Sequence, residues 1–358
     1  MQRVCVLLRS LAPGGAEKQA LLLTHVLRER HDVRLVLLDR EPCAERHVET
    51  LRRLGIEPVF LPRAGAGWLG KAWQLYRLFR RERIQVLFCF LPSDTVLGSI
   101  AARLAGVPHI YGGLRNSRVT RNKERALKFV HNHVAHGTVS NSHAARSYFA
   151  GRGFRESRWH VIQNGIEIGP EAPAREPSRA PRILTVSRFV PEKDHYTALC
   201  AIRAVLDVDA ELPFTYTLAG NGVLEPLIRD WIRELGLEER VELVVDPENV
   251  EALFANSDLY LSMSHFEGVS NSIMEAMHAG ASVVATDVGD NARLVEDGVN
   301  GRIVSIGDVE ATTRALHERI ASSELRQAEG RASRERLVEG FGLDAFQRQY
   351  EALLAAKS

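Results

Sequence analysis

The chain has 358 residues, of which 45% are apolar and 25% are charged, and its formal net charge is +1. This composition is that of a folded globular protein, and the length suggests two domains of ordinary size. No apolar run approaches the length that spans a bilayer, and the apolar first residues are too short for a signal peptide and lack a cleavage site. The four cysteines have no metal or redox spacing, which favours a reduced, cytosolic protein.

Charge is divided unevenly between the two halves of the chain. Residues 1–170 contain 27 Lys and Arg against 13 Asp and Glu, a net charge of +14, whereas the remainder contains 19 against 32, a net charge of −13. Such an asymmetry concerns binding partners and not the fold. We expect the basic half to attract an anionic partner, which could be a phospholipid surface, a lipid-linked phosphate or a nucleic acid.

In residues 1–168, apolar runs alternate with segments of helical period. The expected strands cover 3–8, 33–38, 58–61, 86–91, 137–140 and 160–162, and the expected helices cover 16–30, 68–83 and 95–105. This alternation with short connections indicates right-handed βαβ units and a parallel sheet. We therefore expect residues 1–168 to form one Rossmann-like domain.

A segment rich in proline and poor in large apolar residues, 169–181, indicates a linker. Alternation then resumes, with strands expected at 182–186, 215–218 and 241–244, a polar cap and short strand at 257–262, and helices at 196–205, 226–235, 250–255 and 271–279. We expect residues 182–340 to form a second Rossmann-like domain. Residues 341–358 should contain a last helix, roughly 343–355.

The most informative segment is 264–275, in which Glu267 and Glu275 stand eight positions apart. Glu267 precedes an expected helix and Glu275 lies within it, so both carboxylates can point into one cleft. A helix N-terminus offers unpaired backbone N–H groups and a positive dipole end, which suit a phosphate. The order of strand, acidic turn and helix therefore predicts a site for a ligand with phosphates at one end and hydroxyls at the other, namely a nucleotide-sugar.

The spacing of the two glutamates resembles the E-x7-E motif of the retaining GT-B glycosyltransferases of family 4, the group 1 glycosyltransferases, and residues 276–287 resemble the segment that follows it there. The resemblance implies an α/β chain with GT-B architecture, in which two Rossmann-like parallel-sheet domains face each other across a cleft and the last helix packs back on the first domain. It implies that Glu275 holds the donor ribose and that Glu267 contacts the donor sugar. The backbone that would meet the sugar and the distal phosphate is that of Gly268, Val269, Ser270 and Asn271.

Two other segments of the expected second domain resemble the same family. Arg188 and Lys193 follow a strand, at the edge where ligands bind in open α/β sheets. They match the family's GR-x-x-x-x-KG element, whose Arg and Lys hold the donor diphosphate, although Asp194 stands where the family usually has Gly. Gly220 and Asn221 resemble the family's G-x-G turn beside the nucleotide. Residues 245–249 fill the loop that normally contacts the base but have Asp-Pro in place of its Gly, which leaves the base open, with a UDP-sugar favoured.

On the expected acceptor side, Gly14, Gly15 and Glu17 resemble the family's GGAE loop, which lies near the transferring phosphate; a plain strand-to-helix turn is the alternative. Many family members place a His that contacts the sugar after a later strand. This chain has no His within 111–118, and we expect Arg115 and Asn116 to face the cleft. Five nearby cations either hold an anionic acceptor or form a solvated helix face: Arg118, Arg121, Lys123, Arg125 and Lys128.

Three other patterns are weaker signals. Asp207 and Asp209 form a D-x-D, the metal motif of a different glycosyltransferase fold, but lie in an expected helix-to-strand connection. The histidines between 131 and 143 lack partners at metal spacing, so we expect no metal and no other cofactor. The segment 68–83 combines basic residues with an aromatic stripe, a pattern that is more often core and otherwise a membrane-surface helix: Trp68, Trp73, Tyr76 and Phe79.

Together with the family resemblance, these features predict a hexosyltransferase-type glycosyltransferase (EC 2.4). The resemblance implies that it transfers a sugar, with retention, from a nucleotide-sugar to a hydroxyl of a glycan or lipid-linked glycan in cell-surface polysaccharide, lipopolysaccharide or related glycoconjugate synthesis. The charge asymmetry adds the hypothesis that the acceptor is anionic and membrane-held. We expect a cytoplasmic protein, with peripheral contact at the inner face of an anionic membrane as an open option.

Three alternatives are kept. The first is a nucleotide-sugar epimerase of the same architecture, and the second is an inactive partner subunit that only binds lipid-linked glycan. The intact set of Glu267, Glu275, Arg188 and Lys193 argues against an inactive copy. The third is nucleic-acid binding by the basic half, which lacks a recognisable motif and the interleaved stacking aromatics, so no nucleic-acid partner is expected.

Overall fold

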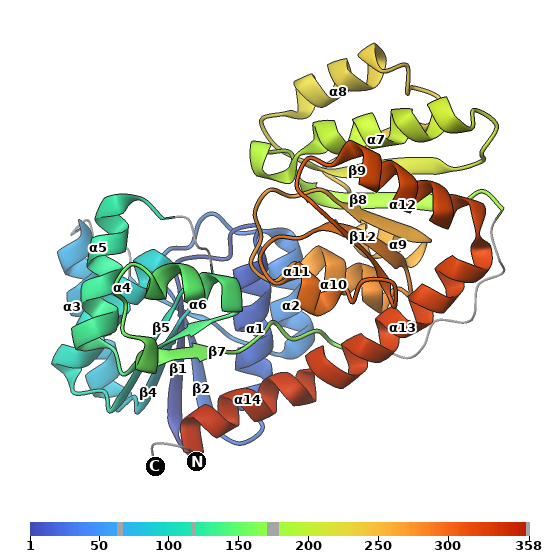
Figure 1. The fold of residues 1–358 in the computed structure, drawn as a ribbon. Helices are drawn as coiled ribbons and strands as arrows, with labels where there is room; N and C mark the ends of the chain where they lie inside the picture. Colours follow the sequence, from blue (N-terminus) through green and yellow to red (C-terminus); the bar gives the residue numbers. More distant parts are fainter. Residues whose placement is uncertain (63–66, 116–118, 170–178, 356–358) are drawn as a thin grey trace. The chain divides into compact units, whose positions relative to one another are not determined.

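The computed structural model describes residues 1–62, 67–115, 119–169 and 179–355 (Figure 1). Asn116, Arg118 and most of the predicted linker lie outside these residues. The chain divides into two compact units, Met1–Gly165 with Leu343–Ser358 and Ile166–Gly342. Each unit is built on one parallel sheet. The predicted fold class, α/β with two parallel sheets, is therefore confirmed.

The first unit has a seven-stranded sheet in the order β3-β2-β1-β4-β5-β6-β7. Its central strands β1 and β4 are buried almost throughout, as expected for a parallel sheet with helices on both faces. The strands are β1 (Arg3–Leu8), β2 (Asp32–Leu37), β3 (Val59–Phe60), β4 (Val86–Cys89), β5 (His109–Gly113), β6 (Gly137–Ser140) and β7 (Trp159–Val161).

Helices cover both faces of this sheet (Figure 1). Val4 and Val6 of β1 pack with α1 and α14, whereas Cys5 and Leu7, one position along, pack with α3 and α4 on the other face. The last helix of the chain thus belongs to the first unit. The helices are α1 (Gly15–Leu27), α2 (Glu45–Leu54), α3 (Gly67–Arg81), α4 (Pro92–Ala105), α5 (Arg121–Phe129), α6 (His143–Ala150) and α14 (Leu343–Ala355), with short helical turns η1 (Val130–Val134) and η2 (Glu156–Arg158).

The second unit has a six-stranded sheet in the order β10-β9-β8-β11-β12-β13. The strands are β8 (Arg182–Arg188), β9 (Thr215–Asn221), β10 (Val241–Val245), β11 (Leu259–Ser262), β12 (Ser282–Thr286) and β13 (Gly301–Val304). The helical segments are η3 (Pro191–Lys193), α7 (His195–Val208), α8 (Glu225–Glu234), α9 (Val250–Ala255), α10 (Asn271–His278), α11 (Asn291–Leu294), α12 (Val309–Ala321) and α13 (Ser323–Phe341). Because β8 lies beside β9 and β11, the loops that follow these three strands meet at one edge of the sheet.

A buried ion pair fixes α13 in the second unit. Arg319 of α12 donates from Nη2 and Nε to the Glu329 carboxylate of α13, over 2.6 Å and 2.9 Å. Both side chains are 3% exposed, and the Ser282 hydroxyl of β12 contacts the same carboxylate. At Gly330 a Cβ atom would stand 2.0 Å from the carbonyl oxygen of Gly280, so only glycine allows α13 to approach this closely.

The helices and strands that the sequence pattern predicts are present, and their ends differ by at most three residues. The pattern indicated a strand before 111–118 without bounds, where β5 lies, and it did not predict β12, β13 or six of the helices, namely α2, α5, α6, α11, α12 and α13. Within the described ranges, no helix is long and apolar enough to cross a membrane.

Candidate active site

The acidic turn of the second unit connects β11 to α10. Ser270 is the N-cap of α10, and its hydroxyl accepts a hydrogen bond from the backbone N–H of Ile273 at 3.4 Å. Glu267 precedes this cap, whereas Asn271 and Glu275 lie half-buried in the first two turns of the helix. Strand, turn and helix N-terminus therefore follow one another in the predicted order.

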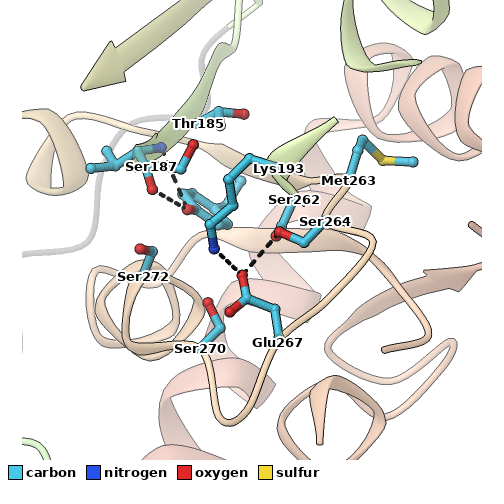
Figure 2. Close-up of a pocket in the computed structure, with 11 residues that line it drawn as sticks. Thr185, Ser187, Lys193, Ser262, Met263, Ser264, Glu267, Ser270 and Ser272 are labelled. Carbon is cyan, nitrogen blue, oxygen red and sulfur yellow. Dashed lines mark hydrogen bonds and ion pairs between the residues drawn. The ribbon is translucent and has the colours of Figure 1, made fainter. Parts of the chain in front are cut away.

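Glu267 is held by two side chains at the edge of a small polar pocket. Figure 2 shows the Lys193 ammonium and the Ser264 hydroxyl directed at its carboxylate. The Ser264 hydroxyl donates to Oε1 at 2.9 Å, and the Lys193 Nζ contacts the same oxygen. The Lys193 and Glu267 side chains are only 18% and 13% exposed. Further hydroxyls line the pocket, from Ser187, Ser262, Ser270 and Ser272.

The two cations of this edge are in different states. Lys193 lies in η3, the turn that follows β8, and its charge is already matched by Glu267. Arg188 is the last residue of β8 and is exposed, and its guanidinium has no hydrogen-bond or ion-pair partner among the described residues. One cation is thus pre-positioned by an anion, and the other is available to an anionic ligand.

A second contact joins the same two loops. Asp194 has φ +45°, an unusual value for a residue other than glycine. Its Oδ1 accepts from the backbone N–H of Thr197 at 3.2 Å, which caps α7, and its Oδ2 lies 2.7 Å from His265 Nε2. The backbone N–H of His265 also donates to the carbonyl of Glu192 at 2.9 Å. Sequence reasoning noted Asp194 only as a departure from the family pattern and missed its partner.

The buried side chain of His195 contacts the C-terminal end of β8. It is 2% exposed, and its Nε2 lies 3.2 Å from the Arg188 carbonyl and 3.4 Å from the Ser187 hydroxyl. Burial lowers the pKa of His195, partly opposed by the bond to the Arg188 carbonyl, so the ring is neutral near pH 7. Sequence reasoning missed this residue; the only signal is its place directly after the cap of α7.

The loops after β9 and β10 are also joined. Gly220 has φ +152°, and a Cβ there would stand 1.8 Å from the Ser187 carbonyl oxygen, so β8 and β9 can approach only because this residue is glycine. The Asn221 amide contacts the Asp246 carboxylate, and Asp246 has φ +48°. The predicted G-x-G turn and the predicted base loop therefore lie side by side.

The backbone of the acidic turn is fixed by the loop after β12. The Gly268 carbonyl accepts from the backbone N–H of Asp290 at 2.9 Å. A Cβ at Gly289 would stand 2.5 Å from the Glu267 carbonyl, so this contact requires glycine. Val269 is 6% exposed and packs in the core, so it can offer only backbone groups to a ligand.

In the first unit, the predicted acceptor loop lies at the start of α1. Gly15 is the first residue of α1, and Glu17 is 5% exposed with its carboxylate folded against Gly14, where a Cβ would stand 2.3 Å from Oε2. Burial raises the pKa of Glu17, opposed by its own backbone N–H and by the charges of Arg46 and Arg115. The Glu17 carboxylate therefore lies at the N-terminus of α1, where the helix dipole favours a negative charge.

Arg115 is bound within the first unit. Its guanidinium lies over the Phe90 ring at 4.2 Å and donates to Asn164 Oδ1 at 2.9 Å and to the Tyr350 hydroxyl at 3.3 Å. It thus joins the end of β5 to α14. Tyr350 is 235 positions away in the chain, so no local pattern could have indicated the contact.

The weaker metal patterns have structural roles. Asp207 lies in the last turn of α7, not in the expected connection, and pairs with Arg203 at 2.6 Å. His131 is buried between the Thr138 hydroxyl at 2.8 Å and the Arg155 carbonyl at 3.0 Å. In the parts of the chain that the structure covers, no group of three or more His, Cys, Asp or Glu side chains could hold a metal ion.

Comparison with known proteins gives consistent matches along the chain. Residues 13–169 match the family model described as Glycosyltransferase Family 4, and residues 180–322 match the model described as Glycosyl transferases group 1. The lipopolysaccharide core biosynthesis glycosyltransferase LpsE of Rhizobium meliloti (strain 1021) is 26% identical, over 96% of each chain. The UDP-Gal:alpha-D-GlcNAc-diphosphoundecaprenol alpha-1,3-galactosyltransferase of Escherichia coli is 21% identical, over 75% of this chain and 74% of its own.

Solved structures agree in fold at low identity. HepE of Anabaena, in complex with UDP and glucose, superposes with a TM-score of 0.85 at 20% identity, over 99% of this chain and 100% of its own. The lipopolysaccharide outer core galactosyltransferase WaaB in its apo form superposes with a TM-score of 0.77 at 15% identity, over 100% of both chains. Two family models that together span most of the chain, and GT-B neighbours over its whole length, show that this protein is a glycosyltransferase of the group 1, family 4 class with the GT-B fold.

Proposed function

We propose that the protein transfers a hexose, with retention, from a UDP-sugar to a hydroxyl of an anionic, lipid-linked or lipopolysaccharide-type glycan. The observation that supports this most directly is the pairing of Lys193 with Glu267 at the edge of the second sheet where ligands bind in open α/β folds. At the same edge β8 ends with the exposed Arg188, whose guanidinium has no partner among the described residues. A cation next to a carboxylate suits a ligand that offers a diphosphate to one and sugar hydroxyls to the other.

The donor half of the reaction follows from these groups. The diphosphate takes Lys193 and Arg188 as counter-ions, which leaves the Glu267 carboxylate to accept hydrogen bonds from the sugar hydroxyls, while Glu275 holds the ribose. The C1–phosphate oxygen bond breaks and a C1–acceptor oxygen bond forms on the same face, as the family resemblance implies. The acceptor hydroxyl proton passes to the departing phosphate oxygen. Positive charge from Arg188 and Lys193 stabilises the negative charge that develops on that phosphate.

The proposed donor and acceptor classes rest on relatives. The E. coli relative is named for UDP-Gal and a diphosphoundecaprenol acceptor, LpsE for the lipopolysaccharide core, and the HepE structure contains UDP and glucose. An anionic acceptor also fits the net charge of +14 over residues 1–170.

We propose peripheral contact with the inner face of the cytoplasmic membrane through α3. Trp68, Leu69 and Trp73 are 50%, 76% and 60% exposed, whereas Phe79 of the same helix is buried in the core. The aromatic stripe is therefore divided between core and surface. Exposed Trp and Leu beside basic residues suit an interfacial helix. Co-sedimentation with anionic vesicles should be strong at low salt and weak at high salt, and absence of binding at low salt would contradict this part of the proposal.

A binding screen tests the donor assignment. Wild-type protein and Glu275→Ala should be compared against UDP-, GDP-, ADP- and TDP-sugars, with Glu339→Ala, an exposed position of α13, as the matched control. We expect one nucleotide class, that of UDP, to bind the wild type and the control and to bind Glu275→Ala at least tenfold more weakly. Equal binding by Glu275→Ala would contradict the site. Conversion of the donor sugar without any acceptor would instead support the epimerase alternative.

A further inference from the structure

The first unit contains a cavity of about 560 Å³ that the donor chemistry does not use. It lies among α3, α4 and α5 at the carboxyl edge of the first sheet, and residues that follow β1 and β2 also line it. Its size is that of a small-molecule site and far exceeds an ordinary packing void. The apolar part of its wall consists of Leu38, Trp68, Pro92, Val96, Leu97 and Ala126.

The rim of this cavity is basic. Arg9, Lys71 and Lys123 line it, and Asp39 is its single carboxylate among the described residues. The Asp39 carboxylate pairs with the Arg9 Nε at 3.4 Å and contacts the Lys71 ammonium. Burial opposes the charge of Asp39, but the hydrogen bonds and charges of Lys71 and Arg9 hold its pKa below the usual value, so it stays ionised. Three cations against one carboxylate leave an excess of two positive charges.

We propose that this cavity binds the apolar chain of a lipid phosphate, with the phosphate at the rim formed by Arg9, Lys71 and Lys123. The inference rests on the proposed function, since it assigns to one cavity the lipid end of a lipid-linked acceptor. Free inorganic phosphate has no apolar part that could cover the apolar wall of the cavity. An uncharged amphiphile would cover the wall but would leave the cations of the rim without a counter-ion. The exposed Trp68 of the wall extends the apolar surface outward.

Calorimetric titration with alkyl phosphates, below their micelle concentrations, tests the class of ligand. Affinity should rise about fourfold for each added CH₂ from hexyl to decyl phosphate, because each buried methylene contributes about that factor. Inorganic phosphate should not bind measurably, and uncharged decyl glucoside should bind at least tenfold more weakly than decyl phosphate. No dependence on chain length, or equal binding of inorganic phosphate, would overturn the proposal.

Matched variants locate the site. Val96→Trp fills the cavity and should weaken decyl phosphate binding at least tenfold, whereas Leu104→Trp places the same side chain at the exposed far end of α4 and should leave binding unchanged. Lys123→Ala removes one rim charge and should weaken binding severalfold, and Arg103→Ala, near the same far end of α4, is its control.

UDP-sugar binding separates this inference from the proposed function. Val96→Trp should bind the UDP-sugar like the wild type, and a far-UV circular dichroism spectrum and melting curve like those of Leu104→Trp show that its first unit is folded. If decyl phosphate binds Val96→Trp and Leu104→Trp equally while UDP-sugar binding is intact, the cavity assignment is wrong and the glycosyltransfer proposal stands. If UDP-sugar binding is absent in the wild type while Val96→Trp still abolishes decyl phosphate binding, the donor assignment is wrong and the cavity assignment stands.

Discussion

The two cations of the donor edge should differ in their effect on stability, although the proposed mechanism gives them the same task in catalysis. Lys193→Ala removes one of the two groups that hold the Glu267 carboxylate, whose side chain is 13% exposed. A hydrogen bond to a charged group contributes about 1.5–3 kcal/mol. Ser264 continues to donate at 2.9 Å, so we expect the free energy of unfolding to fall by about 1–3 kcal/mol. Arg188→Ala removes an exposed side chain with no partner in the described structure and should change it by less than about 0.5 kcal/mol.

Both substitutions should reduce kcat/KM for sugar transfer on the order of 10²-fold, or about 2.7 kcal/mol of transition-state stabilisation. The reason is that each removes one positive charge that would stabilise the negative charge on the departing diphosphate. Urea unfolding gives the stability, and initial rates with a saturating acceptor give the activity. Arg331→Ala, at an exposed position of α13, serves as the control that removes an equal charge away from the site.

The double variant Lys193→Ala/Glu267→Gln separates the two effects. Neutralising Glu267 removes the uncompensated carboxylate, so at least half of the lost stability should return while the activity stays low. A Lys193→Ala enzyme with less than a threefold loss in kcat/KM would refute the catalytic role. A double variant no more stable than Lys193→Ala would refute the electrostatic explanation.

Three further outcomes follow from other contacts. Arg319→Met should destabilise the second unit by about 3–5 kcal/mol in urea unfolding, since it leaves the Glu329 carboxylate buried and unpaired, and a second change, Glu329→Gln, should restore part of the loss. Asp94 lies fully buried in the first turn of α4, and this burial raises its pKa from 3.8 to about 7. Its protonated form therefore favours folding below about pH 4, and this contribution is lost as the pH rises through about 7. The melting temperature of Asp94→Asn should rise relative to the wild type between about pH 5 and pH 8, and an unchanged difference would contradict the raised pKa. Asp194→Gly relieves a positive φ but removes the bond to His265, and we expect the donor KM to rise about 3- to 10-fold with little change in melting temperature, whereas an unaltered KM would show that the contact does not position the site.

The local sequence pattern was sufficient to predict the helices and strands whose buried side is apolar. Strands such as β1 and β4 are continuous apolar runs, and α7 places its apolar residues at helical spacing. The helix α13 has 19 residues and was not predicted, because four of its six buried positions are polar or glycine: Arg326, Glu329, Gly330 and Ser333. Its burial depends on an ion pair with α12 and on close backbone approach, and neither leaves an apolar stripe in the sequence.

In the candidate site, too, features that depend on neighbouring residues could be predicted from the sequence, and contacts between distant residues could not. The acidic turn and the cap of α10 depend on neighbouring residues, and their order could be predicted from the sequence. The contact of Lys193 with Glu267 joins residues 74 positions apart. The sequence placed each of them at a strand end of the second sheet, but no local pattern indicated that the two side chains touch. The expectation that Arg115 faces the cleft stays a prediction, and the structure adds that Asn164 and Tyr350 bind its guanidinium, a contact made possible because the C-terminal helix folds onto the first unit.

The donor edge of the second unit is already ordered by contacts between its own loops. The loop after β8 is joined to the loop after β11, and the loop after β9 to the loop after β10, through polar side chains. Loops fixed before the ligand arrives lose little conformational entropy on binding, so more of the interaction energy remains for the transition state. In the proposed mechanism, donor binding breaks one of these contacts as it forms new ones, because a diphosphate that pairs with Lys193 displaces the Glu267 carboxylate from it. We therefore expect donor binding to depend on the strength of these pairs as well as on their charge: Lys193–Glu267, Asp194–His265 and Asn221–Asp246.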